Sequence, residues 1–440
     1  MKLLVYTAQP TKRASYACRV LFECILGMPV EMTNNWSRFL SADTLRMIYG
    51  RPPARSGLPW LPCVPLLRET GVHPIPYTVR DFDQRPAACF VPDSASALLP
   101  FDLLAFTFLL VTRYEEYLPF QSDQHGRFPA TASLAHRYGF LHRPVLQEWG
   151  AELWKRLKAH YPTLPDHRPR YQFRPTYDVD MAWAYRYRPL WRQLAGLARD
   201  TLTGNTRLIR ERIGVLRSKT NDPFYTFAEL ERLHREYDLH PIFFVLLGMH
   251  GPYDKNLPPE GQPMQALIAD LARQADTGLH PSYRSNEHPE ALQAEVQHFA
   301  RLTGQPPLRS RQHFLKLSFP ATYRQLIQAG IQEDYTMGYA DATGFRAGLA
   351  VPYPWYDLEA ESEQPLTLYP FVLMDVTLKQ YLHLSSEGAI AEIRALVSQI
   401  KATGGLFIPL WHNSSFAKHH GWAGWDKVHE TLLQYGKAES

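Results

Sequence analysis

Two aspartates separated by one residue, Asp178 and Asp180, have a type and spacing that could support catalysis. They follow Tyr171–Pro175, which is predicted to form a short strand, so they lie where that strand ends. Residues two apart in an extended segment point the same way, and both carboxylates could therefore share one small site. One carboxylate could hold a metal while the other acts as a base. Taken alone, the motif favours the alternative of a turn in which Asp caps a helix.

Other predicted strands in this part of the chain alternate with helical segments. This repeat predicts an α/β fold with a parallel sheet or barrel. A barrel would place its site at the carboxyl ends of its strands. The predicted strands are Gln172–Tyr177, Ile242–Leu247, Gly278–His280, Leu308–His313, Ile331–Tyr335, Tyr369–Met374 and Leu406–Trp411.

Three histidines also lie at the ends of predicted strands: His280, His313 and His412. A single histidine is more often a structural residue than a ligand. Several histidines and aspartates that each end a separate strand of one barrel would converge on one place, however. Zinc prefers such a mixture of imidazole and carboxylate ligands, with one position open for water. The pattern therefore favours metal-assisted hydrolysis, with a carboxylate base and a histidine acid.

The order of motifs over residues 171–416 resembles that of the NodB-type polysaccharide deacetylases. The motifs are Thr-Tyr-Asp-x-Asp, Gly-Leu-His-Pro-Ser, an arginine-bearing strand, an aspartate strand with Gly-Phe-Arg-Ala-Gly, and Leu-Trp-His-Asn. The resemblance implies a distorted (β/α) barrel and metal-dependent hydrolysis of N-acetyl or O-acetyl groups on glycans. It also implies a role for each matching residue. Asp178 matches the catalytic base, Asp180 a metal-binding aspartate, His280 the first metal-binding histidine, Arg311 the arginine that orients the base, and His412 the general acid.

One position departs from the family pattern. The second metal-binding histidine normally lies four residues after the first, and here that position is Arg284. A guanidinium carries only donors and cannot be a ligand. His313 is predicted to complete a site for a divalent metal such as Zn²⁺, with Ser282 and His288 as alternatives. The other possibility is that the metal is lost and Arg284 replaces its charge or binds an acidic sugar.

Four residues near these motifs are candidates for substrate contacts: Tyr283, Arg284, Arg346 and Trp411. For the aromatic residues, plain packing is the alternative. A long insertion, from Met181 to about Pro223, is rich in aromatic residues and arginine. It could form a lid or a platform on which sugar rings stack, or an ordinary helix that covers a barrel edge.

The length of 440 residues indicates more than one domain. We expect a smaller N-terminal α/β domain over residues 1–165 and the deacetylase-like barrel over residues 166–440, with a proline-rich linker at Tyr161–Arg170. The N-terminal part resembles an accessory region found before this barrel in some bacterial proteins of unassigned function. Its expected elements are strands at Leu3–Tyr6 and Thr44–Tyr49 and helices at Ala14–Leu26, Phe101–Tyr117 and Pro144–Lys158.

Composition excludes several classes of protein. The formal charge of +4 is small for this length, so no strong attraction to nucleic acid or anionic lipid is implied. No basic run or RNA-binding signature is present. The longest apolar run, Ala97–Val111, is too short and too interrupted to span a membrane. The N-terminal apolar segment is too short for a secretory signal, so a cytoplasmic location is predicted. The four cysteines form no Cys-x-x-Cys pair, which favours free thiols.

The leading hypothesis is therefore a metal-dependent hydrolase that removes acetyl groups, most simply N-acetyl groups, from a carbohydrate. One alternative is a degenerate barrel that binds a glycan or a protein without turnover, and Arg284 is its best support. Another is a hydrolase of a small-molecule amide such as a cyclic ureide. The sequence leaves the oligomeric state open.

Overall fold

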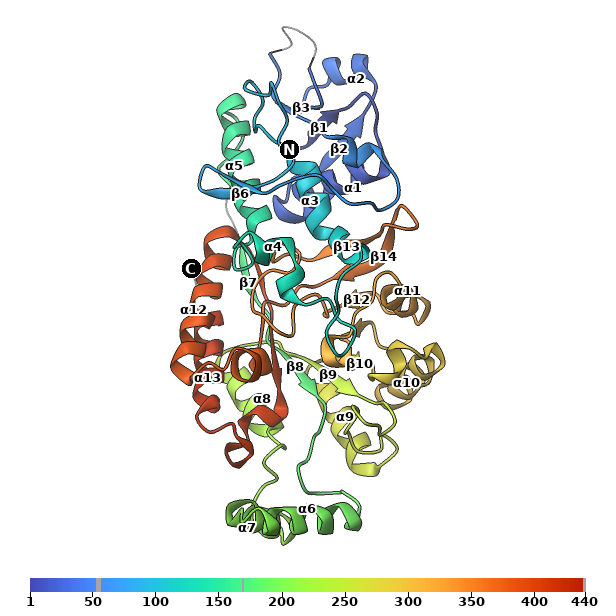
Figure 1. Ribbon diagram of the computed structural model, residues 1–440, viewed down its shortest axis with the longest axis vertical. Helices are drawn as coiled ribbons and strands as arrows, with labels where there is room; N and C mark the ends of the chain where they lie inside the picture. The colour runs from blue at the N-terminus through green and yellow to red at the C-terminus, as the bar shows by residue number, and fades with distance from the viewer. Residues whose placement is uncertain (53–56, 168–169, 438–440) are drawn as a thin grey trace.

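A computed structural model describes residues 1–52, 57–167 and 170–437 (Figure 1). Residues 168 and 169 of the predicted linker lie outside this range. The molecule is elongated: the N-terminal part forms one end, a large sheet with its helices forms the middle, and a two-helix hairpin forms the other end.

The N-terminal part contains a four-stranded parallel sheet in the order β2-β1-β3-β4. The predicted helix after β1 is split into an α-helix, α1, and a π-helical segment. The long apolar helix, α3, is buried on every side, which explains its lack of an amphipathic pattern. The bounds are β1 Leu3–Tyr6, α1 Lys12–Arg19, β2 Val30–Thr33, α2 Trp36–Ser41, β3 Leu45–Tyr49, β4 Trp60–Leu61, β5 Arg80–Phe82, β6 Arg85–Ala87, α3 Leu103–Val111, α4 Leu134–Arg137 and α5 Val145–His160.

The second part is organised around a nine-stranded sheet in the order β13-β14-β12-β11-β10-β9-β8-β17-β15. All its ladders are parallel except the one between β13 and β14. Its strands are β8 Thr176–Val179, β9 Ile242–Leu246, β10 Asp276–His280, β11 Arg309–Ser310, β12 Glu333–Asp334, β13 Tyr353–Asp357, β14 Ser362–Leu368, β15 Leu373–Met374 and β17 Pro409–His412. A separate short ladder joins β7 Tyr171–Phe173 to β16 Gly405–Phe407.

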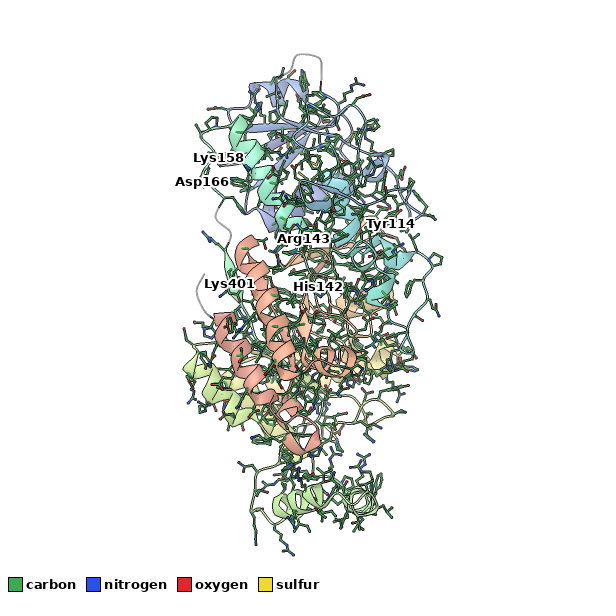
Figure 2. The ribbon with its side chains drawn as sticks, turned by 60° about the vertical axis from the view of Figure 1, so that its left-hand side comes forward. Tyr114, His142, Arg143, Lys158, Asp166 and Lys401 are labelled. Atoms are coloured by element: carbon green, nitrogen blue, oxygen red, sulfur yellow. The ribbon has the colours of Figure 1, made fainter. Side chains whose placement is uncertain are left out.

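Helices flank this sheet, and α12 and α13 pack against each other on one side of it (Figures 1 and 2). His142, from the N-terminal part, lies close to α12, where its Nε2 is 3.4 Å from Oε1 of Glu392 (Figure 2). The helices are α8 Phe227–Glu236, α9 Gln262–Gln274, α10 Pro289–Thr303, α11 Ala321–Gln328, α12 Ser386–Thr403 and α13 Trp425–Lys437.

The predicted α/β class with a parallel sheet is confirmed, but a closed barrel is not. Within the described residues no ladder joins β13 or β14 to β15. Instead the chain itself passes from β14 to β15 through residues 369–372. There Tyr369 N donates to Asp334 O at 2.8 Å, and Phe371 N donates to Met337 O at 3.1 Å. The antiparallel hairpin β13–β14 was not predicted, because its sequence lacks a clear alternation of buried and exposed residues.

The two parts of the chain share one continuous core. The main cluster of buried apolar side chains includes Leu3 and Leu110 from the first part and Tyr353 and Leu433 from the second. A domain boundary at residues 165/166 therefore stays a prediction. At the interface, Gly344 (φ +116°) approaches the N-terminal part so closely that a Cβ would lie 2.4 Å from the carbonyl oxygen of Leu141.

The arginine of the Gly-Phe-Arg-Ala-Gly motif lies at this interface. Its guanidinium binds the carboxylate of Glu116 with Nη2–Oε2 and Nε–Oε1 distances of 2.5 and 2.9 Å. Arg113 donates to the same carboxylate and to the backbone carbonyl of Arg346. All three side chains are buried. Arg346 is therefore placed to join the two parts rather than to contact a substrate.

Candidate metal and catalytic site

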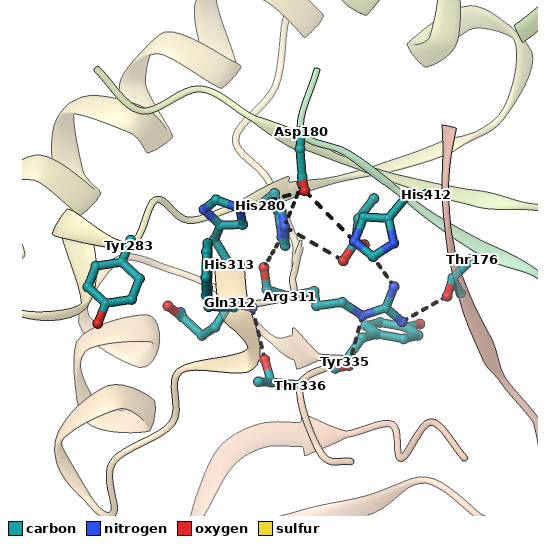
Figure 3. Close-up of polar contacts among 12 residues, drawn as sticks. Thr176, Asp180, His280, Tyr283, Arg311, Gln312, His313, Tyr335, Thr336 and His412 are labelled. Carbon is teal, nitrogen blue, oxygen red and sulfur yellow. Dashed lines mark hydrogen bonds and ion pairs between the residues drawn. The ribbon is translucent and has the colours of Figure 1, made fainter. Parts of the chain in front are cut away.

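The ends of β8, β10, β11 and β17 bring the predicted chemical residues together (Figure 3). Register explains this convergence, because His412 pairs with Asp178 across β17 and β8. Strand β9 lies between β8 and β10, and its Phe244 and Leu246 pair with Asp178 and His280. The site residues therefore sit at nearly the same level of neighbouring strands.

Three of these side chains form a compact set of possible metal ligands. One ligand atom from each of Asp180, His280 and His313 lies within 4.8 Å of the others. The two imidazoles present Nε2 to the carboxylate, at 3.2 Å from Oδ1 for His280 and at 3.6 Å from Oδ2 for His313. His313 is oriented by an irregular turn, in which the following residue, Phe314, has φ +59°.

The second nitrogen of each histidine is already engaged. Nδ1 of His280 lies 2.5 Å from the backbone carbonyl of Arg311, and Nδ1 of His313 lies 2.8 Å from Oδ1 of Asp254. Both partners can only accept a hydrogen bond, so Nδ1 carries the proton and Nε2 of the neutral ring is free to bind a metal. This arrangement fixes the tautomer that a ligand needs.

The electrostatics of the set also fit a cation. Oδ1 of Asp180 is buried and has no hydrogen-bond partner among the described residues. Burial would raise the pKa of Asp180, but His313, His280 and His412 hold it well below its usual value. Burial would lower the pKa of His313, yet Asp180 and Asp254 raise it to about 9. The second proton of His313 would lie on Nε2, the atom that would otherwise bind a divalent ion. The donor set of one carboxylate and two imidazoles suits Zn²⁺.

The predicted base is held by the predicted arginine. Arg311 is fully buried and donates from Nη1 to Oδ1 of Asp178 at 2.9 Å. It also donates to Oγ1 of Thr176 at 2.8 Å and to the backbone carbonyl of Tyr335 at 3.0 Å. The other carboxylate oxygen of Asp178 faces Nε2 of His280 at 3.6 Å. Arg311 therefore fixes the carboxylate at the edge of the metal-ligand set.

The predicted acid, His412, lies across the site. Its Nδ1 is 2.8 Å from Oδ1 of Asp375, whose Oδ2 accepts from the backbone N of His412. Its Nε2 is 3.8 Å from Oδ2 of Asp180. Burial would lower the pKa of His412, but Asp375, Asp180 and Asp178 raise it to about 10. The ring therefore carries a proton at neutral pH, as a general acid must.

Five of these six side chains, all except Arg311, line one cavity of about 390 Å³. Its far wall is partly supplied by the N-terminal part, because Arg127 reaches it and donates from Nη1 to the carbonyl of Phe314 at 2.7 Å and from Nη2 to the hydroxyl of Tyr381 at 3.1 Å. The lining residues are Arg127, Asp178, Asp180, His280, Gln312, His313, Phe314, Leu315, Met374, Val376, Gln380, Tyr381, Leu410 and His412.

The four predicted substrate contacts lie outside this lining. Arg284 is exposed on a short 3-10 turn. Tyr283 packs against Tyr253, with ring centroids 4.2 Å apart and the ring planes tilted by 32°. Trp411 is 1% exposed and packs against Trp425, and Arg346 is bound at the interface of the two parts. Strand alternation explains Trp411, because its neighbour His412 faces the cavity and successive side chains point to opposite faces.

Sequence reasoning missed the carboxylate that orients His313. Asp254 lies in the loop after β9 and is buried. Nothing in its local sequence distinguishes it from a turn residue. Arg127 was missed as well, because it comes from the other part of the chain. Asp375 directly follows the predicted strand Tyr369–Met374 and was expected as a polar residue at a strand end, but without a role.

Comparison with protein families finds a match over the first part of the chain. The model of a family of unknown function (DUF7033) matches residues 3–162. Comparison with curated proteins gives no match. Among the residues that the structure describes, no helix has the length and apolar character to cross a membrane. The predicted cytoplasmic location stays a prediction.

Three solved structures are among those found to be similar to this chain. A Mycobacterium smegmatis protein, whose name places it among polysaccharide deacetylases, has 14% identity over 61% of this chain and 85% of its own, with a TM-score of 0.39. Puue allantoinase has 12% identity over 61% and 83%, with a TM-score of 0.36. The polysaccharide deacetylase Bc1974 from Bacillus cereus has 11% identity over 61% and 89%, with a TM-score of 0.29. Similarity at this level leaves the function to the chemistry of the site.

Proposed function

We propose that this protein is a metal-dependent hydrolase that removes acetyl groups, in the first place N-acetyl groups, from a carbohydrate. The observation that carries the proposal is the convergence on one cavity of a carboxylate held by arginine, a histidine held by aspartate, and three side chains that could be metal ligands. Asp180, His280 and His313 would hold a divalent ion, for which Zn²⁺ is the best match to the donor set.

The roles follow from the contacts of each side chain. A bound divalent ion supplies Lewis-acid polarisation of a carbonyl oxygen and lowers the pKa of a water. Asp178, kept in place by Arg311, accepts the proton of the attacking water. His412 is protonated at neutral pH and gives its proton to the departing amine nitrogen. Asp375 orients His412 and stabilises its charged form.

The cavity volume of about 390 Å³ is that of a site for a small molecule. We therefore propose a substrate part the size of one or two sugar rings. Phe314 and Tyr381 are the aromatic side chains that line the cavity, and they are the candidates to contact a sugar face. Gln312 and Gln380 can exchange hydrogen bonds with its hydroxyl groups.

A second candidate is hydrolysis of a small-molecule amide by the same residues. It is favoured by the size of the cavity and by the position of Trp411 and Tyr283, which lie outside the lining and so provide no extended sugar platform. Release of acetate from N-acetylated sugars, compared with ring opening of cyclic ureides, separates the two candidates.

The test combines metal content with acetate release. Purified protein loaded with Zn²⁺ should bind one ion and release acetate from N-acetylated mono- and disaccharides. Asp178→Asn should retain the ion and lose about 10²- to 10⁴-fold in kcat. Asp276→Asn is a matched control, because Asp276 starts β10 at the opposite end of the strand and pairs with Arg174. Normal turnover by Asp178→Asn would rule out its role as base. Glycan binding without metal or turnover would instead support the non-catalytic alternative.

A further inference from the structure

The insertion between β8 and β9 forms a helical hairpin with its apolar face turned outward. The hairpin consists of α6 Leu190–Leu202 and α7 Thr206–Leu216, and it stands away from the rest of the molecule (Figure 1). On α6, Leu190, Leu194 and Leu202 are 81%, 66% and 88% exposed, and Trp191 is 65% exposed. Their spacing puts them on one face of the helix. Nothing in the described part of the chain covers this face.

The residues of α6 that are buried are both polar. Gln193 and Asp200 are buried against α7. Arg212 of α7 is also buried, and it donates to Oδ2 of Asp200 at 2.7 Å and to Oε1 of Gln193 at 3.1 Å. A helix that packs through its polar side and exposes leucines reverses the usual arrangement of a soluble protein. An exposed apolar face of this kind marks an interaction surface.

The whole insertion that carries the hairpin, residues 181–222, also concentrates positive charge. Residues 181–222 contain nine arginines and lysines but three carboxylates, a formal charge of +6 against +4 for the whole chain. The remainder of the protein is therefore slightly acidic. A second copy of the hairpin would carry the same charge and be repelled, so the partner of this surface is anionic. The cations are Arg186, Arg188, Arg192, Arg199, Arg207, Arg210, Arg212, Arg217 and Lys219.

Beside the apolar face, four arginines line a cavity of about 480 Å³: Arg188, Arg192, Arg199 and Arg212. Of these, Arg199 and Arg212 pair with the buried Asp200. The Nε atoms of Arg188 and Arg212 are buried and have no hydrogen-bond partner within the described residues. Guanidinium groups gathered around one cavity favour an anion there, such as a phosphate group.

We propose that this hairpin docks the protein on an anionic phospholipid membrane. Trp191 and the exposed leucines enter the boundary between headgroups and acyl chains, while the surrounding arginines contact lipid phosphates. The arginine-lined cavity takes one phosphate headgroup. Leucines favour lipid over a sugar or a nucleic acid, because those partners would use aromatic rings or base contacts instead. The proposal is independent of the deacetylase function, since none of these residues lines the site cavity.

The full-length protein can be tested by flotation with vesicles. It should float with vesicles of phosphatidylcholine containing phosphatidylglycerol, stay unbound to phosphatidylcholine alone, and be released by salt. The combined variant Leu190→Ser, Leu194→Ser, Leu202→Ser should lose about tenfold or more in vesicle binding. The double variant Leu40→Ser, Leu308→Ser is the matched control. Both leucines are exposed in other parts of the protein, so this variant should still bind vesicles.

The arginine arm of the test uses Arg188→Gln and Arg192→Gln, which should each weaken binding about fivefold. The exposed Arg137, replaced by Gln, is the control for loss of charge alone. Failure of the wild type to bind anionic vesicles at low salt would overturn the proposal. So would a leucine-dependent dimer in solution, binding of inorganic phosphate with no vesicle binding, or binding to nucleic acid in place of vesicles.

Discussion

Two clusters of buried charge in this protein look alike in composition but differ in how completely their atoms are satisfied. At the interface of the two parts, Arg346 and Arg113 both donate to the carboxylate of Glu116. At the strand ends, Oδ1 of Asp180 is buried without a hydrogen bond, and Nε2 of His280 faces two carboxylates.

The difference distinguishes a cluster that stabilises the fold from a cluster that could bind a ligand. Buried polar groups are nearly always paired, so a completed cluster needs nothing more than its own side chains. A cluster with free acceptors and free imidazole lone pairs is completed by something else, and a cation matches its charge. The resemblance in sequence treated Arg346 and Asp180 alike as site residues, and the contacts divide them.

The largest effect on stability is expected at the interface cluster. Glu116→Gln should lower the free energy of unfolding by about 3–5 kcal/mol, because it removes the carboxylate that two buried guanidinium groups share. Arg113 keeps its ion pair with Glu115, whereas Arg346 loses the ion pair that it makes within the described residues. Zinc content per folded molecule should not change. Chemical denaturation measures the first quantity and metal analysis the second.

The control for this prediction is Glu363→Gln, which removes a more exposed partner of Arg19 and should cost at most about 1 kcal/mol. If Glu116→Gln were as stable as this control, the interface cluster would contribute nothing as a completed network. If it lost zinc while folded, the two clusters would be coupled.

An intermediate effect is expected at the carboxylate that orients His313. Asp254→Ala should weaken zinc affinity about 10- to 100-fold, because Nδ1 of His313 loses the partner that fixes its tautomer. Asp254→Asn should lose less zinc affinity, since the amide oxygen of asparagine can still accept the hydrogen bond from Nδ1 of His313. Competition with a zinc-binding chromophore measures the affinity. An unchanged affinity for the alanine variant would show that Asp254 does not support the site.

The smallest effect is a pH dependence of stability at Glu295. The buried carboxyl group of Glu295 accepts hydrogen bonds from N and Oγ of Ser282 at 3.0 and 2.5 Å. Ser282 lies in the loop that follows His280. Burial raises the pKa of Glu295 to about 7. Folding therefore favours the protonated form of Glu295. The contribution of this form to the free energy of unfolding is complete below the pKa of the unfolded state, and it is lost as pH rises through about 7.

Glu295→Gln should remove this loss. Relative to the wild type, the free energy of unfolding of the variant should increase by on the order of 1 kcal/mol between pH 5 and pH 8. Thermal unfolding at several pH values measures it, with the exposed Glu290→Gln as a control. A parallel pH profile for Glu295→Gln and the wild type would contradict the raised pKa.

Much of the site followed from local pattern and from one resemblance. Asp178 and Asp180 share a face because residues two apart in a strand do so, and His280 and His412 also end strands. The same alternation points the side chain of Trp411 away from the cavity that His412 faces. The expectation that Trp411 contacts a sugar did not take this alternation into account. Arg284 was set aside as a metal ligand on chemical grounds, since an arginine cannot be one.

The sequence by itself determined the α/β class, the strand ends at which chemistry could occur and the absence of a second histidine four residues after His280. Tertiary structure alone decided that the turn at Phe314 brings His313 to Asp180, and that Arg346 meets Glu116 across 230 residues of chain. It also turned the apolar face of α6 outward. Strand and helix periods are local properties, whereas these outcomes depend on which distant surfaces pack together.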